Sequence, residues 1–312
     1  MQQMAPDIAD EALLARVAWL YYNDGLTQSE IGDALNLTRI KVSRLLDSGR
    51  SSGLIQVRIN SRHQGCLELE TRVKAQFGLD DCRVIPASTH EDTNLRVGQA
   101  AAQYLMQKLS PGDSLSVGWG ETVSHSIRML GYTAQERGIA LFTLTGGVRT
   151  YLEGMREANW HSNVNIIPAP LVVSTAELAQ TLMKEPAVAS LMSQALAADY
   201  KLVGIGGMSD AATVVTQGYI SRSEIEPLRR DGARGDILFH FYDRNGQDIG
   251  LPLHARVVGV DLEQLRASER VIGAAGGVTK AGPILSALRG GIIDILVTDE
   301  PTALALLDAT EG

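Results

Sequence analysis

Short apolar runs, each followed by a Gly-, Pro- or Thr-containing turn and usually by a helical pattern, recur along this chain and constrain its fold more than any other feature. Strands that alternate with helices favour a mostly parallel sheet with helices on both faces. We therefore expect an α/β domain of the Rossmann-like type, which binds its ligand outside the carboxyl ends of the strands. The expected strands are Arg83–Pro86, Ser114–Val117, Leu141–Leu144, Val164–Ile167, Leu202–Ile205, Val271–Ala274 and Ile293–Val297.

The length favours more than one domain. The chain has 312 residues, 45% of them hydrophobic, and domains typically hold roughly 100–200 residues. We expect a boundary near residue 62, which gives domains over residues 1–62 and 63–312. The acidic N-terminus lacks the order of a signal peptide, and no apolar run reaches the roughly 20 residues of a membrane span. With only Cys66 and Cys82, which match no metal-binding spacing, these features predict a cytoplasmic protein without a membrane partner.

The first sixty residues carry a different pattern. Apolar residues at three- and four-residue steps predict one helix over Glu11–Tyr22, which Gly25 ends. Thr27 and Glu30 form a T-x-x-E capping box before a second helix that runs to about Leu35. After a tight turn at residues 36–37, Thr38 caps a third helix, whose apolar positions 42, 45, 46 and 49 share one side. This order of elements is typical of a helix-turn-helix.

The other side of the third helix has the chemistry that DNA binding needs. Basic side chains can neutralise phosphates, while Ser43 and Ile40 can meet base edges and a thymine methyl group. Residues 54–60 alternate as the strand of a winged hairpin would. The whole chain carries a net charge of −8, but residues 36–62 hold six Lys or Arg and one Asp, a net +5, which leaves −13 elsewhere. The predicted DNA-binding residues are Thr27, Gln28, Thr38, Arg39, Ile40, Lys41, Ser43, Arg44, Arg50 and Arg58. The alternative is a solvated helical subdomain with scattered basic residues.

The segment VAWLYYNDGLTQSEIGDALNLTRIKVSRLLDSGRSSGLIQVRIN resembles the DNA-binding end of the SorC-type (sorbose-operon-regulator) family of sugar-responsive bacterial transcriptional regulators. GDSLSVGWGETV, TLTGGV, GDILFHFYDRNG and GGVTKAGPILSALRGG resemble the effector domain of that family, so the likeness covers nearly the whole chain. Within that family, the chain resembles the regulators of autoinducer-2 uptake and of sugar-alcohol catabolism. The resemblance implies operator DNA as a partner, a homotetramer, and an effector fold like that of ribose-phosphate isomerase and glucosamine-phosphate deaminase.

Three turns after expected strands are candidates for binding an effector. The first, at residues 118–122, opens a helix whose free N–H groups can hold a phosphate or sugar oxygen, and Trp119 can stack on an apolar ligand face. The others are a Thr-Gly-Gly turn and a Gly-Gly-Val-Thr-Lys turn. Asp236 is a candidate acceptor for sugar hydroxyls. The family resemblance implies the same loops. The predicted effector-binding residues are Trp119, Gly120, Glu121, Thr122, Thr145, Gly146, Gly147, Asp236, Gly276 and Lys280.

Each candidate also has a structural interpretation. A Gly after a strand serves turn geometry as readily as a phosphate, Trp119 can belong to the core, Lys280 can be solvated, and Asp236 can cap a helix. The six histidines form no H-E-x-x-H or H-x-H set, so we expect no metal site, and His125 alone lies near the predicted pocket. The stretch Gly204-x-Gly206-x-x-Ser209 lacks the third Gly of a dinucleotide fingerprint, so we expect no cofactor.

The main alternative function is a sugar-phosphate isomerase or deaminase, for which Asp236 or Glu121 would serve as general base. A DNA-binding module gives such an enzyme no benefit. It does make a ligand-dependent conformational change useful, because a sugar-derived effector can shift the arrangement of subunits and thereby change operator affinity. We therefore expect a regulator of a carbohydrate-catabolism operon, controlled by a sugar, sugar alcohol or sugar phosphate.

Overall fold

The computed structural model describes residues 8–22, 24–51, 55, 64–88, 92–148, 151 and 163–311. The chain divides into two compact units, Met1–Ser61 and Arg62–Gly312. Each unit has its own hydrophobic core. Among the described residues, no helix is both long enough and apolar enough to cross a membrane.

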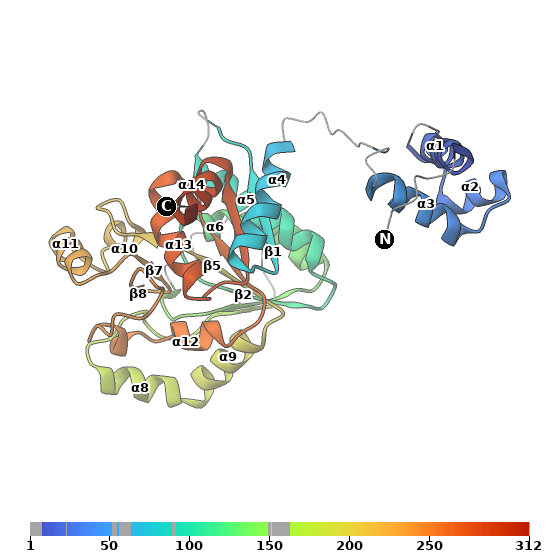
Figure 1. Ribbon diagram of the computed structural model, residues 1–312. Coiled ribbons are helices and arrows are strands. Elements are labelled where there is room, and N and C mark those ends of the chain that lie inside the picture. The colour runs from blue at the N-terminus through green and yellow to red at the C-terminus, as the bar shows by residue number, and fades with distance from the viewer. Residues whose placement is uncertain are drawn as a thin grey trace. The chain divides into compact units, whose positions relative to one another are not determined.

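The described part of the N-terminal unit contains three helices, α1 (Ile8–Tyr22), α2 (Gln28–Leu35) and α3 (Arg39–Ser51), which Figure 1 shows in blue. The third helix packs against both of the others. The predicted helical spacing is confirmed, because the same apolar positions form the core of this unit. That core contains Leu14, Val17, Leu20, Ile31, Val42, Leu45 and Leu46.

Local hydrogen bonds fix the turns between these helices. The amide of Glu30 donates to Thr27 Oγ1 and the amide of Thr27 donates to Glu30 Oε2, so the predicted capping box is present. Asn36 ends α2 in the left-handed region with φ of 55°, which Asn tolerates better than most residues. The amide of Lys41 donates to Thr38 Oγ1 at the start of α3. The expected winged strand over 54–60, with Arg58, lies outside the described residues apart from residue 55.

The second unit is built on a parallel sheet of seven strands among the described residues, in the order β1-β10-β9-β5-β2-β3-β4. This confirms the α/β class with a mostly parallel sheet. Chain order reverses beside β2, because β3 lies on one side of it and β5 on the other. The strands are β1 (Asp81–Ile85), β2 (Ser114–Val117), β3 (Ala140–Thr143), β4 (Val164–Asn165), β5 (Tyr200–Gly204), β9 (Val271–Ala274) and β10 (Ile295–Asp299).

Helices cover both faces of this sheet. Figure 1 shows α5 and α6 on one side and α8, α9 and α12 on the other. The helices of this unit are α4 (Gln64–Phe77), α5 (Thr93–Lys108), α6 (Glu121–Glu136), α8 (Ala176–Lys184), α9 (Pro186–Ala197), α10 (Thr213–Thr216), α11 (Arg222–Arg230), α12 (Leu262–Arg266), α13 (Ala281–Arg289) and α14 (Glu300–Glu311), with 3₁₀ turns η1 (His254–Arg256) and η2 (Val278–Lys280).

Several strand ends lie one or two residues from the expected bounds, and two larger differences from the sequence expectation stand out. The strand predicted over 164–167 is shorter, because the amide of Ile167 donates to the Thr143 hydroxyl and Pro168 has no amide hydrogen to donate. A small antiparallel sheet was not predicted at all: β6 (Gly206–Gly207), β7 (Gly235–Ile237) and β8 (His240–Tyr242). Its strands have two or three residues, too few for an alternating pattern to be visible.

Candidate functional site

A cavity of about 320 Å³ opens at the carboxyl end of the parallel sheet, where chain order reverses. Ligands of open α/β sheets bind at this kind of position. Three segments that follow β2, β5 and β9 contribute to it, together with the small antiparallel sheet and the start of α5. Its walls are formed by Asn94, Trp119–Thr122, Gly204–Ser209, Ala211–Val214, Asp236, Leu238, Thr279 and Lys280.

The turn after β2 brings four of the predicted residues to this cavity, Trp119 to Thr122. Gly120 precedes α6 with φ of 123°, a conformation that favours Gly, and it has no side chain to cap the helix. The first N–H groups of α6 are therefore free of any cap from that position and face the cavity end of the helix. Trp119 is buried against Tyr219, with ring centroids 5.4 Å apart, and its Nε1 has no hydrogen-bond partner among the described residues.

Asn94 connects two walls of the cavity, and the sequence analysis did not identify it. Its Nδ2 donates to Glu121 Oε2 at 2.8 Å, while its Oδ1 accepts from the Thr122 hydroxyl at 3.2 Å and from Lys280 Nζ at 3.3 Å. The residue stands one position into α5, after the Asp92 N-cap, whose carboxylate accepts its amide. Asn94 thus orients a carboxylate, a hydroxyl and an ammonium group toward one space.

Asp236 lies at the centre of the short strand β7 and is buried. A Cβ on Gly206, its partner in β6, would lie 1.8 Å from Asp236 Oδ1, so only Gly at 206 leaves room for this carboxylate. Burial raises the pKa of Asp236 to about 7, although the Phe239 amide, Lys280 and His240 oppose this shift. A carboxyl group with such a pKa can accept or donate a hydrogen bond near neutral pH.

Lys280 faces Asp236 across the cavity from the end of η2. Burial lowers the pKa of Lys280, and Asp236, Glu121 and Asp92 oppose this shift by attraction. The ammonium group of Lys280 therefore shares the cavity with two carboxylates, that of Asp236 from β7 and that of Glu121 from the start of α6. Such an arrangement can bind both the hydroxyl and the anionic groups of a small polar molecule.

The Thr-Gly-Gly turn is not part of this cavity wall. The Thr145 hydroxyl is buried and lies 2.8 Å from the Tyr151 hydroxyl. The amides of Gly146 and Gly147 donate to the carbonyls of Val258 and Ala169, both at 2.8 Å. The N–H groups of this turn therefore donate to carbonyls of the protein itself. A Cβ on Gly146 would come within 2.6 Å of backbone oxygens, so Gly is required for packing.

Gly276 likewise does not line the cavity, although Lys280 from the same turn does. A Cβ at 276 would lie 2.8 Å from Val97 and 2.9 Å from Thr93, so this Gly allows α5 to approach the sheet closely. The amide of Gly277 donates to Asp299 Oδ1 at the end of β10. Packing and turn geometry thus account for Gly276. They also account for Thr145, Gly146 and Gly147.

In the N-terminal unit, α3 presents the predicted basic face. Arg39, Ile40, Lys41 and Arg44 are exposed and Ser43 is half-buried, while Val42 and Leu45 between them point into the core. Thr38 and Thr27 are exposed at the N-termini of α3 and α2, and Gln28 is half-buried. The side chain of Arg50 and the whole of Arg58 lie outside what the structure describes.

Comparison with known proteins now identifies the family. A model of the family described as "Putative sugar-binding domain" matches residues 61–308. The transcriptional regulator LsrR of Enterobacter sp. (strain 638) is 45% identical over 303 residues, which cover 96% of this chain and 94% of that protein. LsrR of Klebsiella pneumoniae is 46% identical over the same length, with the same coverage. The full-length sorbitol operon regulator SorC of Klebsiella pneumoniae has a TM-score of 0.70 at 29% identity, covering 96% of this chain and 99% of that one.

The chain belongs to the SorC family of sugar-responsive transcriptional regulators. The resemblance stated from the sequence motifs is confirmed, and the chain is a DNA-binding regulator rather than an enzyme. The cavity at the carboxyl end of the sheet belongs to the sugar-binding domain of this chain. Its lining residues lie between 94 and 280, within the range 61–308 that the family model matches.

A second, shallower hollow of about 590 Å³ lies near the amino ends of β5 and β9 of this regulator. It includes Lys201, whose Nζ already donates to the carbonyls of Ala198 and Glu269 at 2.7 and 3.2 Å. The ammonium group of Lys201 is therefore already bonded within the protein. The smaller cavity remains the better candidate, because its polar groups converge on open space.

Sequence reasoning missed the loop after β5 as well as Asn94. Residues 204–209 were tested only against a dinucleotide fingerprint, yet they line the cavity. The signal that could have identified them is the one that identified Trp119, namely a Gly-rich turn directly after a buried strand. Asn94 has no comparable local signal, because its contacts come from α6 and η2.

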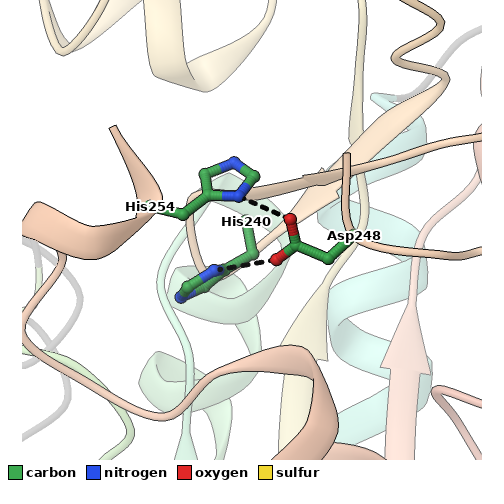
Figure 2. A group of neighbouring side chains, drawn as sticks. All are labelled: His240, Asp248 and His254. Carbon is green, nitrogen blue, oxygen red and sulfur yellow. Dashed lines mark hydrogen bonds and ion pairs between the residues drawn. The ribbon is translucent and has the colours of Figure 1, made fainter. Parts of the chain in front are cut away.

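Three residues that the sequence analysis treated as unrelated also meet in this domain, as Figure 2 shows: His240, Asp248 and His254. His254 Nδ1 lies 2.8 Å from Asp248 Oδ1, and His240 Nδ1 lies 3.6 Å from Asp248 Oδ2. Both histidines are buried. The spacing of the six histidines, from which we expect no metal site, does not reveal this polar cluster.

Proposed function

We propose that this chain regulates a carbohydrate-catabolism operon and that the cavity between β2, β5 and β7 binds its effector, a small sugar, sugar alcohol or sugar phosphate. One observation carries the proposal: Asp236 and Lys280, from distant segments, face each other in a cavity at the reversal point of the sheet. Buried charged groups are costly without partners, so their convergence on open space favours a ligand that supplies those partners.

The lining chemistry fits a polyhydroxylated molecule. Asp236 can accept hydroxyl groups, while Asn94 and Thr122 can exchange their mutual hydrogen bond for bonds to the ligand. Lys280 and the first N–H groups of α6 supply positive charge for a phosphate or an anionic oxygen. Trp119 contributes an apolar surface and an Nε1 donor that lacks a partner among the described residues.

The exposed face of α3 is our proposed DNA-reading surface. Arg39, Lys41 and Arg44 are placed to contact phosphates or guanine edges, and Ile40 to contact a thymine methyl group. Thr27, Gln28 and Thr38 stand at helix N-termini, where side chains and amides commonly position the DNA backbone. Arg50 and Arg58 remain part of the proposed set on sequence grounds.

Effector binding would alter the pairing of recognition helices in a cytoplasmic homo-oligomer. Two-fold operators require at least a dimer, and we propose a tetramer for this chain. The effector would shift the equilibrium between two arrangements of subunits, with residues 1–62 as the DNA-binding domain and 63–312 as the effector and oligomerisation domain. We further propose that the sheet is of the ribose-phosphate-isomerase and glucosamine-phosphate-deaminase type.

The test is a thermal-shift screen of sugars, sugar alcohols and their phosphates, followed by operator binding in the presence of the best compound. A ligand at one hundred times its Kd should stabilise the domain by about 2.7 kcal/mol, which raises the midpoint clearly. We expect at least one compound to do so and to change operator affinity. Rapid turnover of a sugar phosphate, or the absence of a shift across the whole panel, would overturn the proposal.

A further inference from the structure

The hairpin that carries Asp236 contains a strained turn. Leu238 and Phe239 connect β7 to β8 with φ of 55° and 69°, so both residues of this two-residue turn are left-handed. Such turns normally use Asn-Gly or a similar pair, because a large side chain is unfavourable in that conformation. Both side chains are buried, and the Phe239 ring packs between Tyr219 and Phe241 at 5.6 Å from each. The surrounding structure must therefore hold the turn in place.

One of these restraints is His254. The pair Asp236 and Phe241 does not exchange the hydrogen bonds of the β7–β8 ladder, so the amide of Phe241 points to the outer side of the hairpin. There it donates to Nε2 of His254 at 3.0 Å. The imidazole also stacks on the Phe241 ring at an interplanar angle of 14°. Residues 247–249 pair with this edge of β8 through the antiparallel bridge between Tyr242 and Asp248 and the bond from the Ile249 amide to the Phe241 carbonyl. The side chain of His254 supplies the acceptor for the Phe241 amide beside that bridge.

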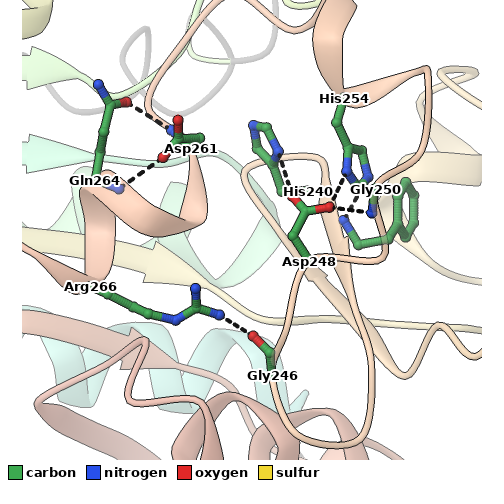
Figure 3. A network of polar contacts seen from close by, with 9 residues as sticks. His240, Gly246, Asp248, Gly250, His254, Asp261, Gln264 and Arg266 are labelled. Atoms are coloured by element: carbon green, nitrogen blue, oxygen red, sulfur yellow. Dashed lines mark hydrogen bonds and ion pairs between the residues drawn. The ribbon is translucent and has the colours of Figure 1, made fainter.

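The Phe241 amide also determines the protonation state of His254. Because a backbone N–H can only donate, Nε2 must be unprotonated, and the single proton of the neutral ring stands on Nδ1, which donates to Asp248. Asp248 in turn accepts the Gly250 amide, as Figure 3 shows, and Arg266 donates to the carbonyl of Gly246 in the same loop. The loop that presents Asp248 is thereby fixed.

This tautomer argues against a metal ion at the cluster. A metal held by His240, Asp248 and His254 would need the lone pair of His254 Nδ1, which the proton occupies. Moving that proton to Nε2 would set two donors against each other at the 3.0 Å contact with the Phe241 amide. The cluster has the residue types of a metal site but the hydrogen-bond pattern of a restraint.

We propose that His254, Asp248 and His240 form a proton-sensitive latch, which holds the β7–β8 hairpin while His254 is neutral and releases the Phe241 amide when the ring is protonated. Because Phe241 is the cross-strand neighbour of Asp236, the latch makes effector binding sensitive to pH. This consequence rests on the function proposed for the cavity. The latch itself does not.

The charges around the cluster are consistent with this role. The groups facing His254 are Asp248 from the preceding loop and His240 from β8, and burial lowers the pKa of His254 despite the attraction of Asp248. Beyond His240 lie Asp236 of β7 and, facing it, Lys280 of η2. The helix α8 packs on η1 but adds no charged group to those that shift the pKa of His254. His240 Nδ1 lies 3.6 Å from Asp248 Oδ2, so His240 contacts the same carboxylate as His254 does.

The experiment is amide hydrogen exchange at Phe241 in the full-length protein at pH 7.5 and 5.5. If the released ring has an ordinary pKa near 6.5, the protection factor should fall about tenfold between these values. His254→Gln keeps an acceptor for the Phe241 amide but cannot titrate, so its protection factor should change less than about twofold. His125→Gln, a half-buried histidine of α6, is the matched control and should behave like the wild type. If His254→Gln does not fold, Asp248→Asn should retain the acceptor and move the transition to lower pH.

Equal pH dependence in the wild type and His254→Gln would overturn the latch. So would stoichiometric binding of Zn²⁺, added alone, that raises the melting temperature of the wild type and is lost in Asp248→Asn. The affinity of the best screened compound should also weaken more from pH 7.5 to 5.5 in the wild type than in His254→Gln. If no compound binds at pH 7.5, the proposed effector function fails, whereas the exchange measurement still decides the latch.

Discussion

The DNA-reading face and the effector cavity are assembled in opposite ways. The face of α3 comes from residues three or four positions apart, and the caps of α2 and α3 are bonds between residues 27 and 30 and between residues 38 and 41. The cavity brings together side chains from residue 94 to residue 280, and its Asn94–Lys280 bond spans 186 positions. A locally determined surface keeps its geometry when distant residues change, whereas the cavity depends on the whole sheet. Substitutions in the two regions should therefore have separable effects.

The largest expected effect is on the cavity. Asp236→Asn removes a buried acceptor and the carboxylate with the largest influence on Lys280, so affinity for the effector should fall about 100-fold. Operator affinity without effector should stay unchanged, because α3 is built without this residue. Isothermal titration and a DNA-binding assay measure the two quantities. Asp231→Asn at the exposed end of α11 is the control, and an equal loss there would contradict the assignment.

A smaller effect is expected on the local surface. If Arg39 or Arg44 contacts a base, its change to Ala should cost about 1–3 kcal/mol of operator binding. If it contacts a phosphate, the change should reduce the slope of log affinity against log salt concentration by about one. Effector affinity should not change. Arg16→Ala, an exposed arginine of α1, is the matched control within the same unit. If both recognition-helix variants bind the operator as the wild type does across a salt titration, the DNA-reading face lies elsewhere.

The pH dependence of stability tests the burial of the cavity carboxyl. Asp236 has a pKa of about 7 when folded and an ordinary value near 3.8 when unfolded, so the folded state binds the extra proton between these values. Stability from this group is thus greatest below pH 4 and declines as pH rises to about 7. Asp236→Asn should therefore gain about 2.5 kcal/mol relative to the wild type from pH 5 to pH 7.5. Denaturant unfolding at both pH values measures it, and parallel curves for the two proteins would contradict the assignment.

The smallest effect compares one helix cap in each region. Thr27→Ala removes the capping box of α2 and should destabilise the N-terminal unit by about 1 kcal/mol. Thr175→Ala removes the equivalent cap of α8, where the Thr175 side chain accepts the Leu178 amide. We expect the first change to weaken operator binding without affecting the effector, and the second to leave operator binding alone. Limited proteolysis of each variant locates the loss, and a loss in the other unit would break the comparison.

The same contrast explains how far the sequence could be interpreted. Helix spacing, caps and the exposed basic residues of α3 are properties of neighbouring positions, so they were predictable before any tertiary contact was known. Parallel strands were also recognisable, because each is a buried apolar run with a turn after it. The three Gly turns looked alike in sequence, yet Gly146 and Gly147 donate their amides to the protein while Gly120 opens onto the cavity. That distinction depends on strand order, which local patterns do not contain.

The histidine cluster and Asn94 could not be predicted either, because their contacts also depend on tertiary structure. Asp248 lies six residues before His254 in an irregular loop, and no helix or strand period connects the two positions. Asp248 comes to lie beside His240 because residues 247–249 pair with the end of β8, through the bridge between Tyr242 and Asp248. Motif searches rely on fixed spacing, whereas these side chains meet because the turn at residues 243–246 returns the chain along β8.

The absence of a side chain at Gly206 has a consequence for comparing relatives. A Cβ at this position would overlap the Asp236 carboxylate where it lies here, so a larger residue at 206 requires that carboxylate to move. Among homologous regulators, we expect glycine at the position of 206 to accompany aspartate at that of 236. A relative with a larger residue at 206 should have replaced the acid and should respond to a differently substituted effector. The pair thus provides a simple criterion for sorting family members by the molecules they sense.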